Sequence, residues 1–393
     1  MNERDRTDDS TALSRRAFLA GSTAGVLVPG AIASGAGRAA AAPVPENAPR
    51  VVRVPAGRTF DISLGDGDSL SDLVIDVSAL GAGYDITATG SNWEVRNVAI
   101  VGRHPGSESA AFAVRVEEPD GIGVIENVWL GDGSRDTIGV FVSPYHAGTL
   151  LIRRCHIARY PGNGVYGSSP GNGPGKPVSG RGGPVRIEEC YSYNNAISGF
   201  RVGTDGSWVR DSVIVQDRRT PSGGGRDATR AIWVYFESAL IENVSFRMAD
   251  GTGIVVGNDS WEKSATRVAL RDVRGAADDL VTGETGDVRG EVAPNPATEI
   301  PDRCPETPAD VFAAPVGPED AVGSGTPDVE RPDDPAWIPA VSGAVGAAAT
   351  SLFGPVLGGV FVFLALLSPG LAILAVVLYV LHRRSKPEGR SRL

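Results

Sequence analysis

The segment Ile125-Glu-Asn-Val-Trp-Leu130 decides the fold, because its pattern returns six more times along the chain. Each copy opens with a branched aliphatic residue, continues with a charged residue and then has a polar or charged third residue. The seven copies begin at Val95, Ile125, Ile152, Ile187, Val209, Ile241 and Leu270, so the intervals run from 22 to 35 residues. Repeats of this length are typical of folds that stack one small structural unit on the next.

A second short apolar unit follows each copy and usually opens with a small residue. These units begin at Ala113, Gly139, Gly164, Gly199, Ala231, Gly253 and Asp279. Short strands with Gly- and Asn-rich corners predict an all-β parallel solenoid. Over about residues 51–283 the coil pattern resembles the pectate-lyase-like superfamily, which implies a single right-handed parallel β-helix. Strand-like runs at Val51–Val54, Phe60–Leu64, Leu73–Val77 and Tyr84–Ala88 are expected to form the first coils and cover the open end.

Stacking places equivalent residues of successive copies about 4.8 Å apart. The first and fourth positions are small or aliphatic and are expected to face inward. The third position is polar and is expected to bond neighbouring backbone at a corner. The second position alternates in sign through all seven copies, as a ladder of Arg96, Glu126, Arg153, Glu188, Arg210, Glu242 and Arg271. We interpret this ladder as structural, because in-register pairing would otherwise stack like charges.

Both ends of the chain carry targeting features. Arg15 and Arg16 precede a weakly apolar stretch and a run of small residues at 39–42, so residues 1–42 resemble a twin-arginine signal peptide. Residues 340–381 contain no charged residue and are long enough for one transmembrane helix, and the basic tail 382–393 is predicted to be cytoplasmic. Residues 43–283 form the predicted β-helix, and the Pro- and acid-rich residues 284–339 form a predicted extracellular stalk without a core. The expected protein is therefore a single-pass cell-membrane protein with its β-helix outside.

The charge of the chain restricts its partners. The whole chain has 37 basic and 47 acidic residues, and only three of the basic residues are lysines, Lys176, Lys263 and Lys386. An acidic, lysine-poor surface protein with twin-arginine export resembles proteins of halophilic archaea. Such a surface repels nucleic acid, so no nucleic-acid partner is predicted.

A row of aromatic and arginine side chains is the candidate binding site. The outward position of the second unit is expected to align Arg115, Phe141, Tyr166, Arg201 and Trp233 in one exterior stripe. Aromatic faces stack on sugar rings, and arginines pair with uronate or sulfate groups. A parallel exterior column contains Trp129, His156 and Tyr191. The alternative is that other parts of the chain cover these side chains as small satellite cores.

We expect a membrane-anchored surface β-helix that binds or processes an extracellular polysaccharide. Anionic polysaccharides are among the expected ligands. The alternative is a non-catalytic structural or adhesive surface protein. If the chain is an enzyme, the resemblance implies a polysaccharide lyase or glycoside hydrolase. Of the motifs that polygalacturonases share, however, only the paired acids Asp278-Asp279 are present, and Gly-His-Gly is absent. Catalytic residues and cofactors are not identified by the sequence.

The remaining polar residues give a few further expectations. The three cysteines and four histidines show no metal-ligand spacing, so no metal site is predicted. Cys155 and Cys190 fall in one inward column, where either a disulfide or two buried thiols would fit. Cys304 falls in the predicted stalk. Of two glycosylation sequons, Asn258 in a turn is the better acceptor than Asn243 in the corner column.

Overall fold

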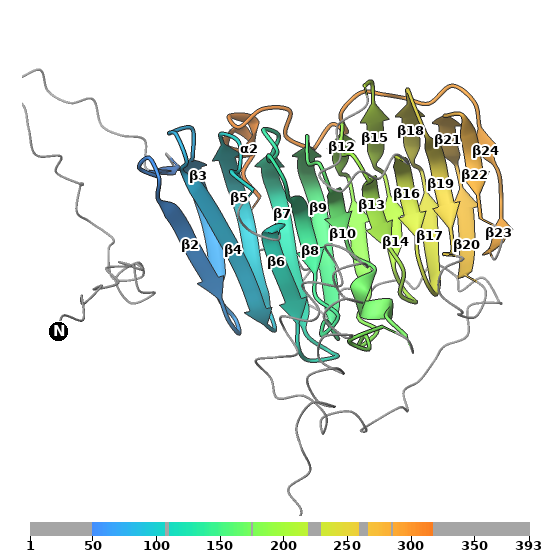
Figure 1. Cartoon of the computed structure of the whole chain (residues 1–393), viewed down its shortest axis with the longest axis horizontal. Helices are drawn as coiled ribbons and strands as arrows, with labels where there is room; N and C mark the ends of the chain where they lie inside the picture. Colours follow the sequence, from blue (N-terminus) through green and yellow to red (C-terminus); the bar gives the residue numbers. More distant parts are fainter. Residues whose placement is uncertain are drawn as a thin grey trace, which may run out of the picture.

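The computed structural model describes residues 49–106, 110–173, 176–218, 229–258, 266–283 and 286–316. Within these ranges the protein is mostly β, with parallel strands and little helix, which confirms the all-β prediction at that level. The strands form two curled parallel sheets that run the length of the molecule (Figure 1). This arrangement is compatible with the predicted parallel β-helix.

The larger sheet, called sheet A here, contains 15 of the described strands. Its first five strands are β1 (Arg50–Arg53), β3 (Ser69–Asp76), β5 (Trp93–Val101), β7 (Ile122–Leu130) and β9 (Thr149–Ala158). The last four copies of the repeat contribute two shorter strands each: β11 (Val185–Glu188) with β12 (Tyr191–Tyr193), β14 (Trp208–Arg210) with β15 (Val213–Gln216), β17 (Ser238–Glu242) with β18 (Ser245–Met248), and β20 (Thr266–Arg271) with β21 (Val273–Ala276). The chain after the last copy adds β23 (Gly286–Arg289) and β24 (Val292–Ala293).

The smaller sheet, sheet B, contains nine of the described strands. They are β2 (Thr59–Leu64), β4 (Gly83–Gly90), β6 (Ala110–Val116), β8 (Ile138–Val142), β10 (Asn163–Tyr166), β13 (Ser198–Val202), β16 (Arg230–Val234), β19 (Thr252–Val256) and β22 (Asp279–Thr282). The helical elements are the 3₁₀ turn η1 (Ser169–Gly171) and the short helix α2 (Asp310–Ala313). Strands of the two sheets alternate along the chain, so each repeat crosses both.

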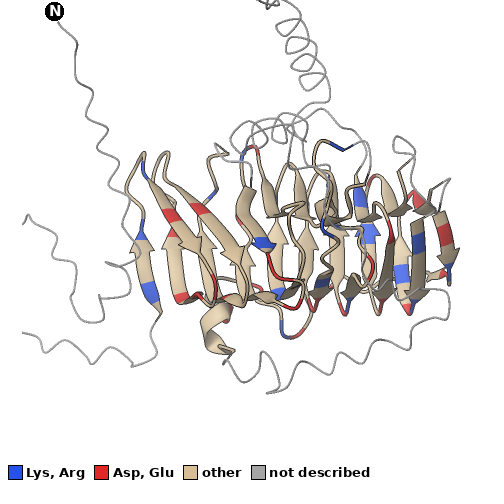
Figure 2. Ribbon diagram, turned by 90° about the horizontal axis from the view of Figure 1, so that it is seen from below, with Lys and Arg blue, Asp and Glu red and all other residues tan. Residues whose placement is uncertain are grey.

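The register of sheet A confirms the predicted columns. Successive members of the charge ladder are direct partners from Arg96 and Glu126 through to Glu242 and Arg271. The first and fourth positions of the repeat line the core, where every member is buried. Acidic and basic positions are accordingly interspersed along the strands (Figure 2). The alternation of sign in the sequence therefore reports real neighbours in space.

The third position of the repeat forms the corner that curls sheet A. All seven residues have φ between 47° and 53°, the left-handed conformation that non-glycine residues seldom adopt. Amide side chains connect neighbouring copies there: Asn127 Nδ2 donates to Asn97 Oδ1 at 2.8 Å, and Asn243 Nδ2 donates to Asp211 Oδ1 at 2.6 Å. Asn and Asp tolerate this conformation best, which explains why they dominate the column.

The C-terminal part of the described chain corrects the predicted stalk. Strands β23 and β24 extend sheet A beyond residue 283, by pairing with β20 and β21. Residues 295–316, which we call the return segment, then run back over the outer face of sheet A to Val316, which donates to Asn97 Oδ1 at 3.0 Å (Figure 1). The stalk prediction is wrong for 286–316. Residues 286–293 continue sheet A, and apolar residues of the Pro-rich return segment such as Cys304 and Val311 pack on the outer face of that sheet.

The predicted signal peptide 1–42, the transmembrane segment 340–381, the tail 382–393 and the rest of the stalk lie outside the described residues. Among the residues that the structure does describe, no helix has the length and hydrophobicity needed to cross a bilayer. The four N-terminal runs form β1 to β4, close to the predicted bounds.

Candidate functional site

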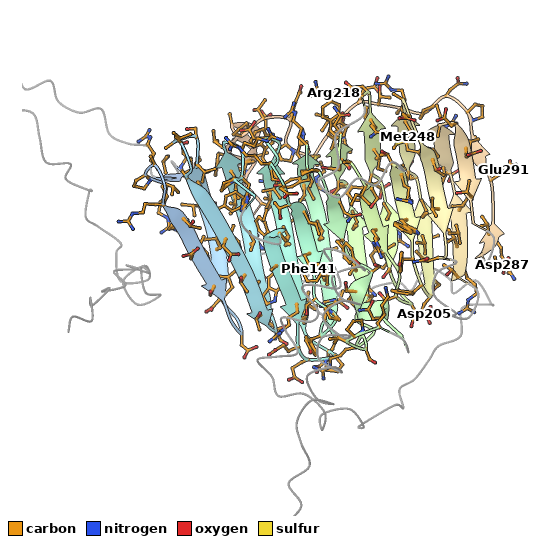
Figure 3. All side chains as sticks on the ribbon, viewed as in Figure 1. Phe141, Asp205, Arg218, Met248, Asp287 and Glu291 are labelled. Carbon is orange, nitrogen blue, oxygen red and sulfur yellow. The ribbon has the colours of Figure 1, made fainter. Side chains whose placement is uncertain are left out.

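Four of the five predicted site residues share one row on the outer face of sheet B. Phe141 pairs with Tyr166, Tyr166 with Arg201, and Arg201 with Trp233. The rings of Phe141 and Tyr166 have centroids 5.6 Å apart. Phe141, on β8, is marked in Figure 3. Parallel pairing therefore brings together side chains that lie 25 to 35 residues apart in the chain.

Arg115 does not belong to this row. In the register of β6 and β8, Ala113 is the partner of Phe141, so Arg115 lies two residues further along its strand. It forms an ion pair with Glu117 at 2.7 Å, and its Cζ lies 5.9 Å from the ring of Tyr145. The prediction is wrong because a slip of two residues keeps every side chain on the same face, so alternation cannot detect it.

The row has an open part and a closed part. Phe141 and Tyr166 are half-buried, whereas Arg201 is 4% exposed and Trp233 is 9% exposed. Trp233 also donates its indole N–H to the carbonyl of Gly257 at 2.9 Å. The two predicted alternatives, an exposed platform and a covered satellite core, therefore each describe one half of the row.

Two aromatic residues that directly follow β16 close the second half. The ring of Tyr235 lies 4.7 Å from Trp233 and 4.4 Å from Phe236. Lys176, from the insertion between β10 and β11, places its Nζ 5.5 Å from the Tyr235 ring. Lys176 lies in an inserted loop that the sequence already suggests could border the row. Tyr235 and Phe236 were not predicted, although the run Trp233-Val-Tyr-Phe236 is a visible signal of aromatic clustering.

Arg201 is the unusual charge of this site. Its Cζ lies 4.2 Å from the centroid of Tyr166, 4.5 Å from Trp233 and 3.7 Å from Tyr235. No carboxylate of the described residues forms an ion pair with it, and its buried Nε has no hydrogen-bond acceptor there. Aromatic faces compensate a desolvated guanidinium only in part. The site therefore holds a buried positive charge without a carboxylate partner among the described residues.

The second predicted exterior column is covered. Trp129, His156 and Tyr191 are in register, as expected. The return segment lies over them: Trp129 Nε1 donates to the Glu306 carbonyl at 3.1 Å, and His156 Nδ1 lies 3.0 Å from the Pro305 carbonyl oxygen. Burial lowers the pKa of His156 to about 4. For this column the covered-core alternative holds.

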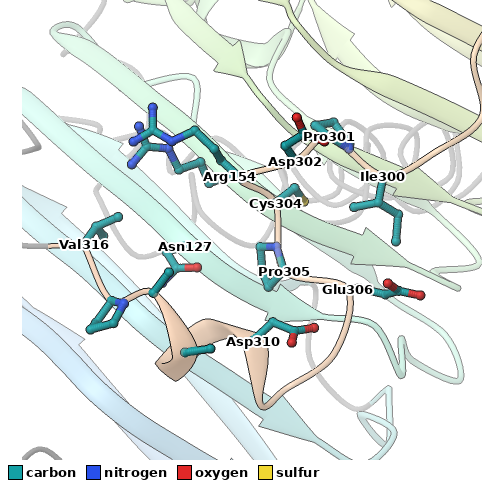
Figure 4. A pocket seen from close by; sticks show the side chains of 14 residues that line it. Asn127, Arg154, Ile300, Pro301, Asp302, Cys304, Pro305, Glu306, Asp310 and Val316 are labelled. Carbon is teal, nitrogen blue, oxygen red and sulfur yellow. The ribbon is translucent and has the colours of Figure 1, made fainter.

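A cleft of about 600 Å³ lies between the corner of sheet A and two stretches of the return segment, 300–306 and 310–316 (Figure 4). Asn127 and Arg154 line it from the sheet, and the rest of its lining comes from 300–316. Arg154 pairs with Glu126 at 3.2 Å and with Glu189 at 2.7 Å, and Asn127 donates to the Val311 carbonyl at 2.8 Å. Because contacts within the chain engage both polar groups, the cleft is a weaker candidate than the row.

The cysteines and the paired acids are the other reactive groups that the sequence singles out. Cys155, Cys190 and Cys304 are buried and unbridged, and burial raises the pKa of the Cys155 and Cys304 thiols. Across the described ranges no group of three or more His, Cys, Asp or Glu side chains is arranged to hold a metal ion. Of the paired acids, Asp278 accepts a hydrogen bond from the Gly251 amide at 3.0 Å.

The two sequons differ in their surroundings. Asn258 is half-buried directly after β19, and Asn243 is exposed but donates to Asp211 in the corner column. Glycosylation of Asn258 stays a prediction.

Comparison with known proteins gives no match: no family model, curated protein or solved structure resembles the chain significantly.

Proposed function

We propose that this chain is a cell-surface protein with a right-handed parallel β-helix of the pectate-lyase-like type, exported by a twin-arginine signal and anchored by one C-terminal helix. Its proposed role is to bind or process an extracellular polysaccharide, with anionic chains as the preferred class. Support for the fold comes from parallel pairing between repeats, and support for the location comes from the sequence features of both termini.

One observation carries the binding proposal: two half-buried rings adjoin a guanidinium without a carboxylate partner among the described residues. The rings of Phe141 and Tyr166 lie on the outer face of sheet B with their centroids 5.6 Å apart. Sugar rings stack on the faces of aromatic rings. Arg201 lies directly beyond Tyr166 and would attract a uronate carboxylate or a sulfate. Trp233 and Tyr235 hold Arg201 in place rather than contacting the sugar.

Binding of purified full-length protein to polygalacturonate, to a sulfated glycan and to a neutral glucan tests this role. We expect the anionic chains to bind more tightly, and Phe141→Ala and Tyr166→Ala each to weaken binding at least tenfold. Tyr193→Ala, which removes a half-buried ring from sheet A, is the matched control and should have little effect. An unmodified protein that binds none of these glycans would remove the proposal and leave the structural or adhesive alternative.

Processing is separated from binding by product analysis. A lyase would produce unsaturated chain ends that absorb ultraviolet light, and a hydrolase would produce reducing ends without that absorbance. Tight binding without either product identifies a binding protein. The burial of Arg201, which is 4% exposed in the closed half of the row, favours a binding protein over an enzyme.

The proposed location is tested by two changes outside the described residues. Replacing Arg15 and Arg16 by lysines should retain the protein inside the cell, because the export machinery reads the arginine pair. Ending the chain at residue 339 should release the protein from the membrane fraction into the medium. Membrane retention of the shortened chain would contradict the single C-terminal anchor.

A further inference from the structure

A second group of arginines surrounds a tryptophan on the outer face of sheet A. Arg186 on β11 is the direct partner of Trp208 on β14, and Leu151 and Leu240 continue the same column on either side. Arg210 follows Trp208 by two residues and so faces the same way. This cluster belongs to the other sheet from the Phe141 to Trp233 row.

The two guanidinium groups contact the same indole ring. Each Cζ, of Arg186 and of Arg210, lies 4.3 Å from the centroid of Trp208. The contacts leave Trp208 only 8% exposed. Two cations against one ring repel each other, and burial together with the charge of Arg210 lowers the pKa of Arg186 to about 10.

Two N–H groups of this cluster, Nε of Arg186 and Nε1 of Trp208, are buried without an acceptor among the described residues. Arg210 Nε lies 3.0 Å from Glu242 Oε2 and forms an ion pair with it. A buried donor without an acceptor costs roughly 1–3 kcal/mol, so the two N–H groups favour an acceptor beside them.

The neighbouring carboxylates do not neutralise Arg186. Glu242 is paired with both Arg210 and Arg271. The arginines whose charge acts on the Glu188 carboxylate are Arg153 and Arg210. No carboxylate of the described residues lies within ion-pair distance of Arg186. Arg186 therefore carries a positive charge without a carboxylate partner among the described residues, beside two buried N–H groups that have no acceptor there.

We propose that Arg186, Trp208 and Arg210 form a binding site for a single oxyanion, a carboxylate or a tetrahedral sulfate or phosphate group. Its oxygens accept from the two arginines and the indole N–H, and its charge removes the repulsion between the two guanidinium groups. Such a group is carried by an acidic or sulfated sugar, or is free in solution as an inorganic ion. The inference does not rest on the proposed glycan-binding row.

Calorimetric titration of the full-length protein with sodium glucuronate, sulfate and phosphate, at constant ionic strength, tests the site. We expect saturable binding of at least one of them, and Arg186→Gln should weaken that binding at least tenfold. Tighter binding of glucuronate identifies a sugar acid as the source, and tighter binding of sulfate or phosphate identifies a tetrahedral group. Circular dichroism checks that the variant folds, and Arg186→Lys, which keeps the charge but loses the planar fork, is the second variant and should also bind weakly.

Arg271→Gln is the matched control, because it removes an arginine from the same face whose side chain is 40% exposed and paired with Glu242. It should change the affinity less than twofold. The proposal is overturned if no oxyanion binds saturably, or if Arg271→Gln weakens binding as much as Arg186→Gln does, since the effect would then be one of net charge. Tyr166→Ala should leave this binding unchanged, which separates the site from the proposed glycan row.

Discussion

Glu126 and Glu242 occupy the same position of the same repeat, yet their surroundings differ. The side chain of Glu126 is 0% exposed and pairs with Arg96 at 3.1 Å, Arg153 at 2.6 Å and Arg154 at 3.2 Å. The side chain of Glu242 is 31% exposed and pairs with Arg210 at 3.0 Å and Arg271 at 3.6 Å. The repeat thus sets which charges are neighbours, but not how much water reaches them.

Two local features produce the difference. The corner position next to Arg153 is Arg154 rather than Asn or Asp, and its long side chain reaches both Glu126 and Glu189. The return segment also lies over this half of the corner, where the Val311 carbonyl accepts from Asn127. A segment that lies 184 residues from Asn127 in the chain therefore helps to close the first half of the ladder, while the half at Glu242 stays open.

The largest expected effect follows from removing the buried acid. Glu126→Ala leaves three arginines facing one another without their carboxylate, and should lower the free energy of unfolding by about 3–5 kcal/mol. Chemical denaturation of the two proteins measures the change. A loss below about 1 kcal/mol, the value for an exposed pair, would mean that burial does not distinguish the two halves.

The second effect concerns the covering of sheet A. Trp129→Ala removes a ring that packs on Val311 and bonds the Glu306 carbonyl, and should cost roughly 3 kcal/mol and loosen the return segment. Limited digestion with trypsin at Arg303 measures this loosening. Trp208→Ala, which removes a ring of the same sheet from a separate cluster, is the control. Equal acceleration of cleavage by both variants would contradict a specific role of Trp129.

The third effect is a dependence of the covering on pH. Because burial lowers the pKa of His156 from 6.5 to about 4, the folded state favours the neutral ring. The unfolded state then binds more protons between these values, so this contribution is fully present above pH 6.5 and is lost as the pH falls towards 4. At roughly 1.4 kcal/mol per pKa unit, the loss is at most about 3.5 kcal/mol.

Hydrogen exchange in the return segment measures this dependence. We expect faster exchange as the pH falls from 6.5 to 4, after correction for the intrinsic rates, and no such trend in His156→Gln. His146 has a similarly low pKa of about 4, but it contacts Val116 and Pro184 rather than the return segment. His146→Gln should therefore retain the trend, and its loss there would assign the effect to general acid destabilisation.

The sequence predicts the features that depend on the repeat. Alternating signs from Arg96 to Arg271 fix the register of sheet A, and the polar third position fixes its corner. Each of these features is a neighbour relation between equivalent residues, so comparing the copies is enough to find it. The row from Phe141 to Trp233 is found in the same way.

Features that depend on non-repeating segments are not predictable in this way. The return segment has many prolines and few apolar residues, which is also the composition of an unpacked linker, so its docking through Cys304 and Val311 is invisible until the sheet surface is known. The closing of Arg201 by Tyr235 depends on a turn after β16. The displacement of Arg115 depends on the length of a connection, which the alternation of strand residues does not report.

The smallest expected effect concerns Glu242, the more exposed of the two acids. Glu242→Ala removes two ion pairs, as Glu126→Ala removes three, but water already screens both and can solvate Arg210 and Arg271 after the change. The free energy of unfolding should fall by about 0–1 kcal/mol. Because the Debye length shortens to about 3 Å in molar salt, even this difference should vanish there, whereas the cost of Glu126→Ala should persist. Denaturation of both variants at low and at molar salt thus separates the effect of pairing from that of burial. If the stability lost by Glu126→Ala also depends on salt, the Glu126 carboxylate is not shielded from water. The two halves of the ladder would then be equivalent.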